Sequence, residues 1–249
     1  MIHRIPIDIR DAERKNLRDK FQSGGPDSPL KGRVRIYERK IDGDKKLYLV
    51  EDTSNLILYR GRNWLAQRAF NSNMSARSVN PSWKDLYLNW FAVGSRGSTS
   101  DPLVPASPTL QDYQLGNQLP ISSVPASDFI TVSGVQFHAF DSTYPQFLYD
   151  TDVNNSTLWS GCQQTDNVQG LSNMRCDGFL IGLIKVTVTS NECNGPATPG
   201  YQDINEAGLF FGLASPTLPT DLGIFSRVCF STIRKDVTRE LVFSWYIYF

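Results

Sequence analysis

Residues that could perform chemistry are few and widely spaced in this 249-residue chain. Nucleophilic catalysis usually needs a base beside the nucleophile, most often a histidine. Of the two histidines, only His138 lies in a strand-like segment, between Gln136 and Phe140. No serine sits in a Gly-x-Ser-x-Gly turn, the usual setting of a hydrolase nucleophile. We therefore expect His138 to be structural and the protein to have no catalytic residues.

A second candidate is the polar segment from Asp141 to Asp177, in which acids and aromatic rings gather. Paired carboxylates can hydrolyse glycosidic bonds, and rings beside acids can form a platform for a sugar. The acids are Asp141, Asp150 and Asp152, and the rings belong to Tyr144, Tyr149 and Trp159. Because Asp and Asn are also common turn residues, the segment is either a set of turns or a surface that binds a receptor or a host glycan.

Metal and cofactor sites have little support. The cysteines form no Cys-x-x-Cys pair and lie far in sequence from both histidines, at Cys162, Cys176, Cys193 and Cys229. Cys229 is in an apolar stretch and is expected in the core, whereas Cys162 and Cys176 flank a polar loop and could pair in an oxidising environment. The segment Gly94–Thr99 lacks the Gly-Lys-Ser/Thr ending of a phosphate loop. We expect no metal and no cofactor.

The basic segment Gly32–Lys40 is more informative. Its cations share one parity with a tyrosine and so one face of a strand, at Lys31, Arg33, Arg35, Tyr37 and Arg39. Such a face can contact phosphates or an acidic protein, or it can protect an exposed edge strand from aggregation. No second basic element extends the stripe. We therefore favour a protein partner over nucleic acid and take Arg33, Arg35, Tyr37 and Arg39 as interface candidates.

One acid and two bases lie in apolar segments near the end of the chain. Glu206 precedes a hydrophobic strand, Arg227 lies among apolar residues of the next strand, and Lys235 follows it. Charges buried in such strands are costly unless they are paired. We predict that Glu206 bonds to Arg227 or Lys235 and fixes the register of the two strands.

Strands are the main elements expected to position these residues. Alternating apolar patterns or turn signals predict strands over residues 32–40, 45–50, 86–93, 129–140, 179–189, 208–213, 223–233 and 241–249. Helical spacing appears only over residues 62–70. The resulting fold class is all-β: an antiparallel, jelly-roll-like β-sandwich with one short helix and extended arms.

The expected organisation is an N-terminal arm and linker over residues 1–31 and a single domain over residues 32–249. Within that domain, residues 94–128 carry five prolines and little periodicity. Proline presets an extended backbone and lowers the cost of ordering it. We expect this segment to be an arm that contacts a neighbouring subunit through Pro102, Pro105 and Pro108, the alternative being a mobile surface loop.

Charge and hydropathy limit the possible partners. Residues 1–100 carry 19 basic and 11 acidic side chains, whereas residues 101–249 carry 6 and 14. This asymmetry suits a basic face that meets an acidic one, unless the folded sheet interleaves the two halves. No apolar run approaches the roughly 20 residues that span a bilayer, and the first residues lack the apolar core of a signal peptide. We expect no contact with a membrane.

Several segments together resemble a recurring pattern in structural proteins of tailed-bacteriophage virions. The first block contains Asn55-Leu56-Ile57, Gly61, Leu65-Ala66, Trp90-Phe91-Ala92-Val93-Gly94, Gly97-Ser98-Thr99 and Asp101-Pro102. The second contains Ile204, Glu206, Gly208-Leu209-Phe210, Phe225-Ser226-Arg227-Val228, Phe230-Ser231, Lys235 and Trp245-Tyr246-Ile247. The resemblance covers residues 55–101 and 204–249 and leaves the middle of the chain unmatched.

The resemblance implies a non-enzymatic virion protein that assembles as a ring or trimer in the neck, collar, tail or baseplate. Its partners would be further copies of itself and other virion proteins. The unmatched residues 129–200 leave room for the alternative, a receptor- or carbohydrate-binding attachment module such as a tail fibre or decoration protein.

Overall fold

The computed structural model describes residues 31–69, 85–109, 111–121, 129–150, 179–195, 200–215 and 221–248. The arm expected over residues 1–30 lies outside these described residues. So do Cys162, Cys176 and most of the polar segment that follows Asp141, including Asp152 and Trp159.

Within the described residues, the protein is mostly antiparallel β-structure with one short helix. The strands are β1 (Lys31–Lys40), β2 (Tyr48–Ile57), β3 (Tyr87–Gly94), β4 (Phe129–Val132), β5 (Val135–Ala139), β6 (Gln146–Asp150), β7 (Phe179–Val188), β8 (Tyr201–Gly212), β9 (Leu222–Asp236) and β10 (Arg239–Tyr248). They join laterally in the order β4-β5-β3-β8-β9-β2-β1-β10-β7-β6. Each of these neighbouring pairs is antiparallel.

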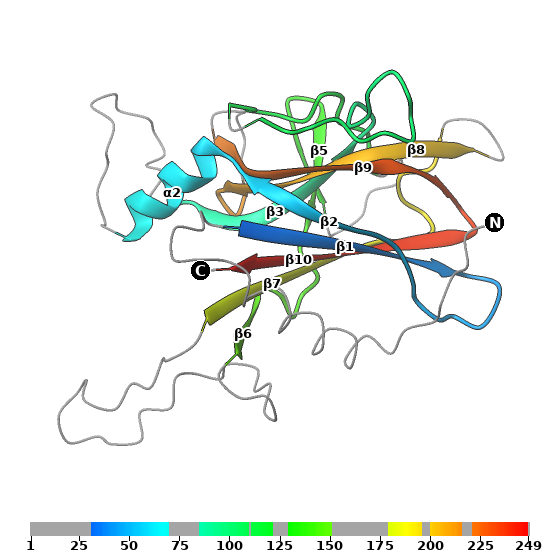
Figure 1. Ribbon diagram of the computed structural model, residues 1–249, viewed down its shortest axis with the longest axis horizontal. Helices are drawn as coiled ribbons and strands as arrows, with labels where there is room; N and C mark the ends of the chain where they lie inside the picture. The colour runs from blue at the N-terminus through cyan, green and yellow to red at the C-terminus, as the bar shows by residue number, and fades with distance from the viewer. Residues whose placement is uncertain are drawn as a thin grey trace.

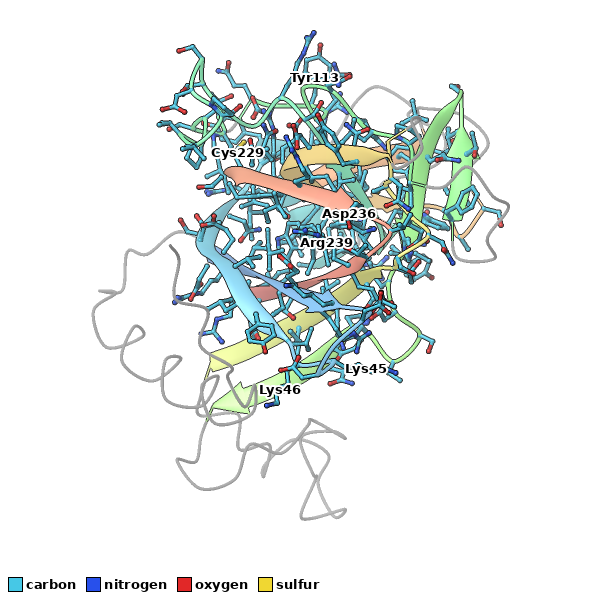
Figure 2. The ribbon with its side chains drawn as sticks, turned by 90° about the vertical axis from the view of Figure 1, so that its right-hand side faces the viewer. Lys45, Lys46, Tyr113, Cys229, Asp236 and Arg239 are labelled. Carbon is cyan, nitrogen blue, oxygen red and sulfur yellow. The ribbon has the colours of Figure 1, made fainter. Side chains whose placement is uncertain are left out.

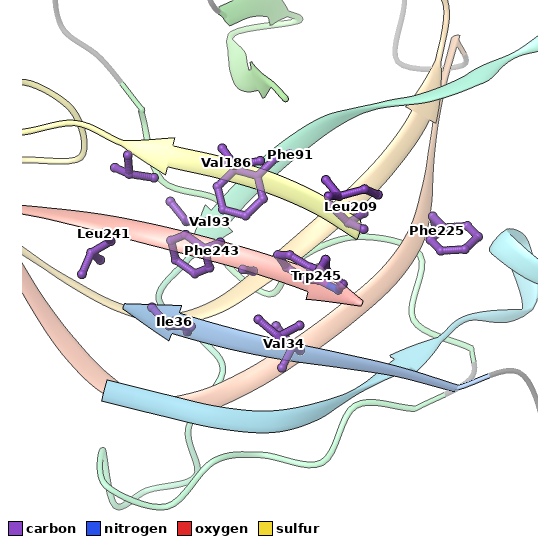
Figure 3. Close-up of a cluster of buried hydrophobic side chains, with 14 of the residues drawn as sticks. Val34, Ile36, Phe91, Val93, Val186, Leu209, Phe225, Leu241, Phe243 and Trp245 are labelled. Carbon is purple, nitrogen blue, oxygen red and sulfur yellow. The ribbon is translucent and has the colours of Figure 1, made fainter. Parts of the chain in front are cut away.

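The sheet curls, so that β1, β10 and β7 lie opposite β3, β8 and β9 (Figure 1). The space between them is filled by side chains from both halves, several of which are labelled in Figure 3. The ring of Phe91 in β3 lies 4.9 Å from that of Phe243 and 5.8 Å from that of Trp245, both in β10. One apolar core therefore holds the two halves of the curled sheet together.

Alternation along the last strand explains this core. In β10, Leu241, Phe243, Trp245 and Ile247 point to one face, as their odd numbering predicts, and all four are buried. The opposite face carries Val242 and Tyr246, which are also buried. The inner face belongs to the shared core, and on the outer face the guanidinium of Arg35 in β1 lies over the ring of Tyr246 at 5.4 Å.

The short helix α2 (Tyr59–Ala69) begins three residues before the predicted helix and ends one residue earlier. It buries Trp64, whose ring stacks on Phe211 at 5.3 Å and meets Phe225 edge-on at 5.7 Å. Gly61 lies against the carbonyl group of Phe225, where a side chain would collide with the backbone. The helix therefore closes one end of the core, beside the first half of β9 (Figure 1).

The single strand predicted over residues 129–140 is in fact two strands. They are β4 and β5, which form a hairpin joined by Ser133 and Gly134. Both residues have positive φ, 51° and 80°, which a tight two-residue turn requires. The Ser-Gly dipeptide was the overlooked signal. Strands β8 and β9 also begin earlier than expected, and consequently Glu206 lies inside β8 rather than before it.

The packing of Phe91 between the two halves of the sheet predicts that removing its ring lowers the stability of the protein. We expect Phe91→Ala to lower the free energy of unfolding by about 3–5 kcal/mol, because it removes a buried ring and leaves a cavity. Tyr113→Ala removes a ring that is 61% exposed and should change the unfolding free energy by about 0.5 kcal/mol or less. Urea denaturation of both variants measures this difference, and equal costs would contradict the shared core.

Candidate functional site

A long loop between β3 and β4, which carries Tyr113, lies over β8 and β9 (Figure 2). We call its described residues 95–109 and 111–119 the anchored loop. It leaves β3 at Gly94 and returns beside it, because Leu119 donates its backbone N–H to the carbonyl oxygen of Val93 at 2.9 Å and Gly94 pairs with Gln118. Leu115, within the loop, is 3% exposed and packs in a second apolar cluster with Phe137 and Phe210. The expected extended arm is therefore folded onto its own chain.

The carboxylate of Glu206 is the main attachment of this loop. Its side chain is fully buried. It accepts backbone N–H bonds from Arg96 at 3.1 Å, Gly116 at 3.0 Å and Asn117 at 2.9 Å. These three donors come from the beginning and the end of the loop. One carboxylate thus ties both ends of the loop to β8.

Arg227, in β9, provides the opposite charge. Its guanidinium donates to Oε2 of Glu206 at 3.0 Å and 2.6 Å, and to the carboxylate of Asp112 at 2.6 Å. The predicted bond between Glu206 and Arg227 is therefore present, and Asp112 in the loop joins it. Burial opposes ionisation of Asp112, but hydrogen bonds from Thr109 and Arg227 outweigh it and lower the pKa of Asp112.

Two glycines permit the close approach of loop and sheet. Gly97 donates its N–H to the side-chain oxygen of Asn205 at 2.6 Å, and a Cβ atom there would collide with the carbonyl group of Asn205. A Cβ atom at Gly94 would meet the carboxylate of Glu206. Both glycines belong to the glycine-rich segment Gly94–Thr99, and here they allow the loop backbone to pack closely against the sheet.

The tip of the anchored loop presents apolar side chains to solvent. Leu103 is 70% exposed and Val104 is 48% exposed, and among the described large hydrophobic residues they form the only exposed consecutive pair. Pro102 and Pro105, two of the predicted interface residues, flank them and are exposed, whereas Pro108 is half-buried.

The backbone of this tip is fixed in spite of its exposure. The carbonyl oxygen of Pro102 accepts from the hydroxyl of Thr232 at 2.7 Å and from its backbone N–H at 3.2 Å. Within the loop, Thr99 donates its N–H to the carbonyl oxygen of Val104 at 2.9 Å. Because the tip is already ordered, a partner that binds Leu103 and Val104 need not bear the entropy cost of ordering them.

Much of the basic face of β1 is covered, which corrects the expectation for Arg35 and Tyr37, whereas Arg33 and Arg39 are half-buried and stay interface predictions. Strand β1 lies between β2 and β10 and is not an edge. Arg35 and Tyr37 are each 3% exposed.

The acids that face these cations come from the same chain. Asp52 in β2 pairs with Arg33 and lies 3.5 Å from Arg35, and Glu240 in β10 pairs with Arg39. The sequence pattern identified the shared face but not the neighbouring strands that neutralise it.

Lys235 lies apart from Glu206. Its side chain is fully buried, and its ammonium group donates to Oδ1 of Asn194 at 3.1 Å and to the carbonyl oxygen of Asp236 at 2.9 Å. Burial lowers the pKa of Lys235 to about 8. Cys193 is also buried, and burial raises its pKa to about 12. This thiol is therefore not set up as a nucleophile.

His138 forms a structural pair. Nε2 of His138 lies 3.2 Å from Oε1 of Glu192, and each residue is 5% exposed. Burial by itself would lower the pKa of His138, but the hydrogen bond and charge of Glu192 outweigh it and raise that pKa. Glu192 also accepts the backbone N–H and the hydroxyl of Thr189, so the pair fixes the turn after β7.

Two further candidates, Asp141 and Cys229, also have structural roles. Asp141 accepts the N–H of Thr187 at 2.9 Å and its hydroxyl at 2.8 Å. Cys229 is buried and unpaired, as expected of a core residue, and burial raises its pKa to about 11. Over the described ranges, no three His, Cys, Asp or Glu side chains gather as a metal site. No helix in the described part of the chain has the length and apolar character needed to cross a bilayer.

Comparisons of the chain with protein-family models, with curated proteins and with solved structures found no significant match. The interpretation of the anchored loop consequently depends on its own contacts.

Sequence reasoning missed Asp112, Asn205, Leu103 and Val104. Asn205 is adjacent to Glu206, and the pair of polar residues in an apolar strand was the available signal. For Leu103 and Val104 the signal was an apolar pair between prolines in a polar segment. Nothing local distinguishes Asp112 from a turn residue.

Removal of the Glu206 carboxylate should release the loop. Glu206→Ala leaves three backbone N–H groups without their acceptor and leaves Arg227 with Asp112 alone. We expect a loss of about 3–5 kcal/mol in unfolding free energy, as for other broken buried pairs, together with faster amide hydrogen exchange at Arg96, Gly116 and Asn117. The control Asp203→Asn removes an exposed pair with Arg234 and should cost about 1 kcal/mol or less. Unchanged exchange at the three amides would contradict the anchor.

The His138 pair predicts a pH dependence of stability. Since its folded pKa is raised, His138 binds its proton more tightly in the folded than in the unfolded protein. Its contribution is therefore complete below the ordinary pKa of about 6.5 and is lost as the pH rises through the folded pKa. The stability difference between wild type and His138→Gln should shrink over that interval in urea titrations. Glu192→Gln should remove the same dependence, and parallel curves for wild type and variants would contradict it.

Proposed function

We propose that this protein is a non-enzymatic structural subunit of a tailed-bacteriophage virion, a homo-oligomeric component of the neck, collar or tail that connects other subunits. The observation that carries the proposal is the tip of the anchored loop, where Leu103 and Val104 are exposed on a fixed backbone. An ordered, exposed apolar pair is suited to burial against another protein. A homo-oligomer repeats such a contact by symmetry, so that many weak contacts hold each subunit.

The placement of the residues that resemble phage structural proteins supports this proposal. Strand β3 and the first residues of its following loop, as far as Pro102, belong to the first block, and β9 and β8 from Ile204 onward belong to the second. The structure brings these blocks side by side, because β8 pairs with β3 on one side and β9 on the other. Glu206 of the second block accepts the backbone N–H of Arg96 in the first block, and Arg227 donates to Glu206. The shared residues therefore build the support of the exposed tip.

For the fold, we infer that the curled sheet is a β-sandwich of the jelly-roll-like kind. The support is the packing of β3 against β10 across one core, with Phe91 against Phe243 and Trp245. A sandwich of this kind is a common scaffold for loops that contact other subunits.

The proposal is tested with particles assembled in cells that produce this protein with the other virion proteins. We expect an affinity-labelled wild-type chain to be found at a fixed position in purified particles by electron microscopy. Leu103→Ser combined with Val104→Ser should lower incorporation by at least about tenfold while leaving urea stability within about 0.5 kcal/mol, because both side chains are exposed. Tyr113→Ala is the exposed control. A chain absent from the particles would overturn the proposal.

A further inference from the structure

The described residues contain an apolar pocket at the end of the molecule closed by α2. Its volume is about 390 Å³. The floor is made by Trp64, Ile184 and Phe225, and the rim includes Leu65, Arg68 and Leu88. The floor residues are buried, whereas Leu65 and Leu88 are half-buried and Arg68 is exposed. Apolar side chains of a partner could therefore enter between the rim residues and reach the aromatic floor.

The chain's own exposed apolar pair cannot reach this pocket. Phe225 and Thr232 both belong to β9. Phe225 lies in the pocket floor, and Thr232 holds the tip of the anchored loop. Seven residues of a strand span about 23 Å. The tip and the pocket are consequently at different positions along β9, and the hydrogen bonds of the tip keep them apart.

The two surfaces are complementary in charge as well as in hydropathy. The tip segment 97–109 carries one charged residue, the exposed acid Asp101, two residues before Leu103. Helix α2, beside the pocket, carries Arg60, Arg62 and Arg68 and no acidic residue. When an apolar pair enters an apolar pocket, an acid beside the pair and a basic helix beside the pocket favour that orientation.

On this basis we propose that the tip of one copy docks in the α2 pocket of the next copy, with Leu103 and Val104 between the rim residues and Asp101 near the arginines of α2. This inference rests on the proposed function and names the contact through which the homo-oligomer forms. A contact between two different surfaces is heterologous: it closes into a ring when the rotation between copies returns to the start, and otherwise it extends as a filament.

The heterologous geometry allows a mixing experiment. The tip variant combines Leu103→Ser with Val104→Ser and keeps an intact pocket. The pocket variant, Leu65→Glu, keeps an intact tip and puts a negative charge on the rim. Each variant alone should be monomeric by size-exclusion chromatography with light scattering, and an equimolar mixture should form a dimer with one copy of each. Leu65→Gln is the milder substitute if Leu65→Glu reduces stability, and Tyr113→Ala should assemble like wild type.

Each outcome of the mixing experiment supports or overturns the docking of the tip in the pocket. A one-to-one dimer in the mixture supports the heterologous contact. Two monomeric variants that stay monomeric when mixed would show that the tip and the pocket do not bind each other, and would overturn it. Variants with the mass of an oligomeric wild type would also overturn it, but would leave the proposed structural function intact. A wild type that is monomeric at all concentrations would overturn the inference, and its absence from virions would then separately overturn the proposed function.

Discussion

The arrangement of this protein depends on one buried carboxylate. Glu206 is surrounded by apolar strands, where an uncompensated charge would be costly. Three backbone N–H groups and the guanidinium of Arg227 compensate it. Such charge-assisted bonds are stronger than bonds between neutral groups. Because its donors come from β9 and from both ends of the loop, the cost of burying this single group forces sheet and loop into one arrangement.

That arrangement gives the molecule an ordered surface feature on its own sheet, where composition suggested an extended arm that contacts a neighbouring subunit. The curled sheet supplies a stiff support through aromatic packing between Phe91, Phe243 and Trp245. The anchored loop carries the exposed pair Leu103 and Val104 on that support. A surface that is ordered before binding loses less entropy on association, which suits the proposed role of a subunit held by many repeated contacts.

The uneven distribution of charge along the chain is also explained in part by contacts within the fold. The excess of bases in the first hundred residues and of acids thereafter is partly cancelled where β1 lies beside β10, as in the pair of Arg39 with Glu240. Arg227 and Asp112 form another pair, between β9 and the loop. Ion pairs within the fold therefore neutralise part of a pattern that, read along the sequence, indicated an external acidic partner.

The sequence by itself determined the antiparallel β class, the short helix, most strands and the need of Glu206 for a cationic partner. These follow from alternation, helical spacing and the cost of a buried charge, which are local. Tertiary structure decided that Arg227 and not Lys235 is that partner, that β1 is an inner strand, and that the proline-rich segment folds back. Each of these depends on which strands become neighbours, and strand order is set by contacts between residues far apart in the chain, such as Glu206 with Gly116.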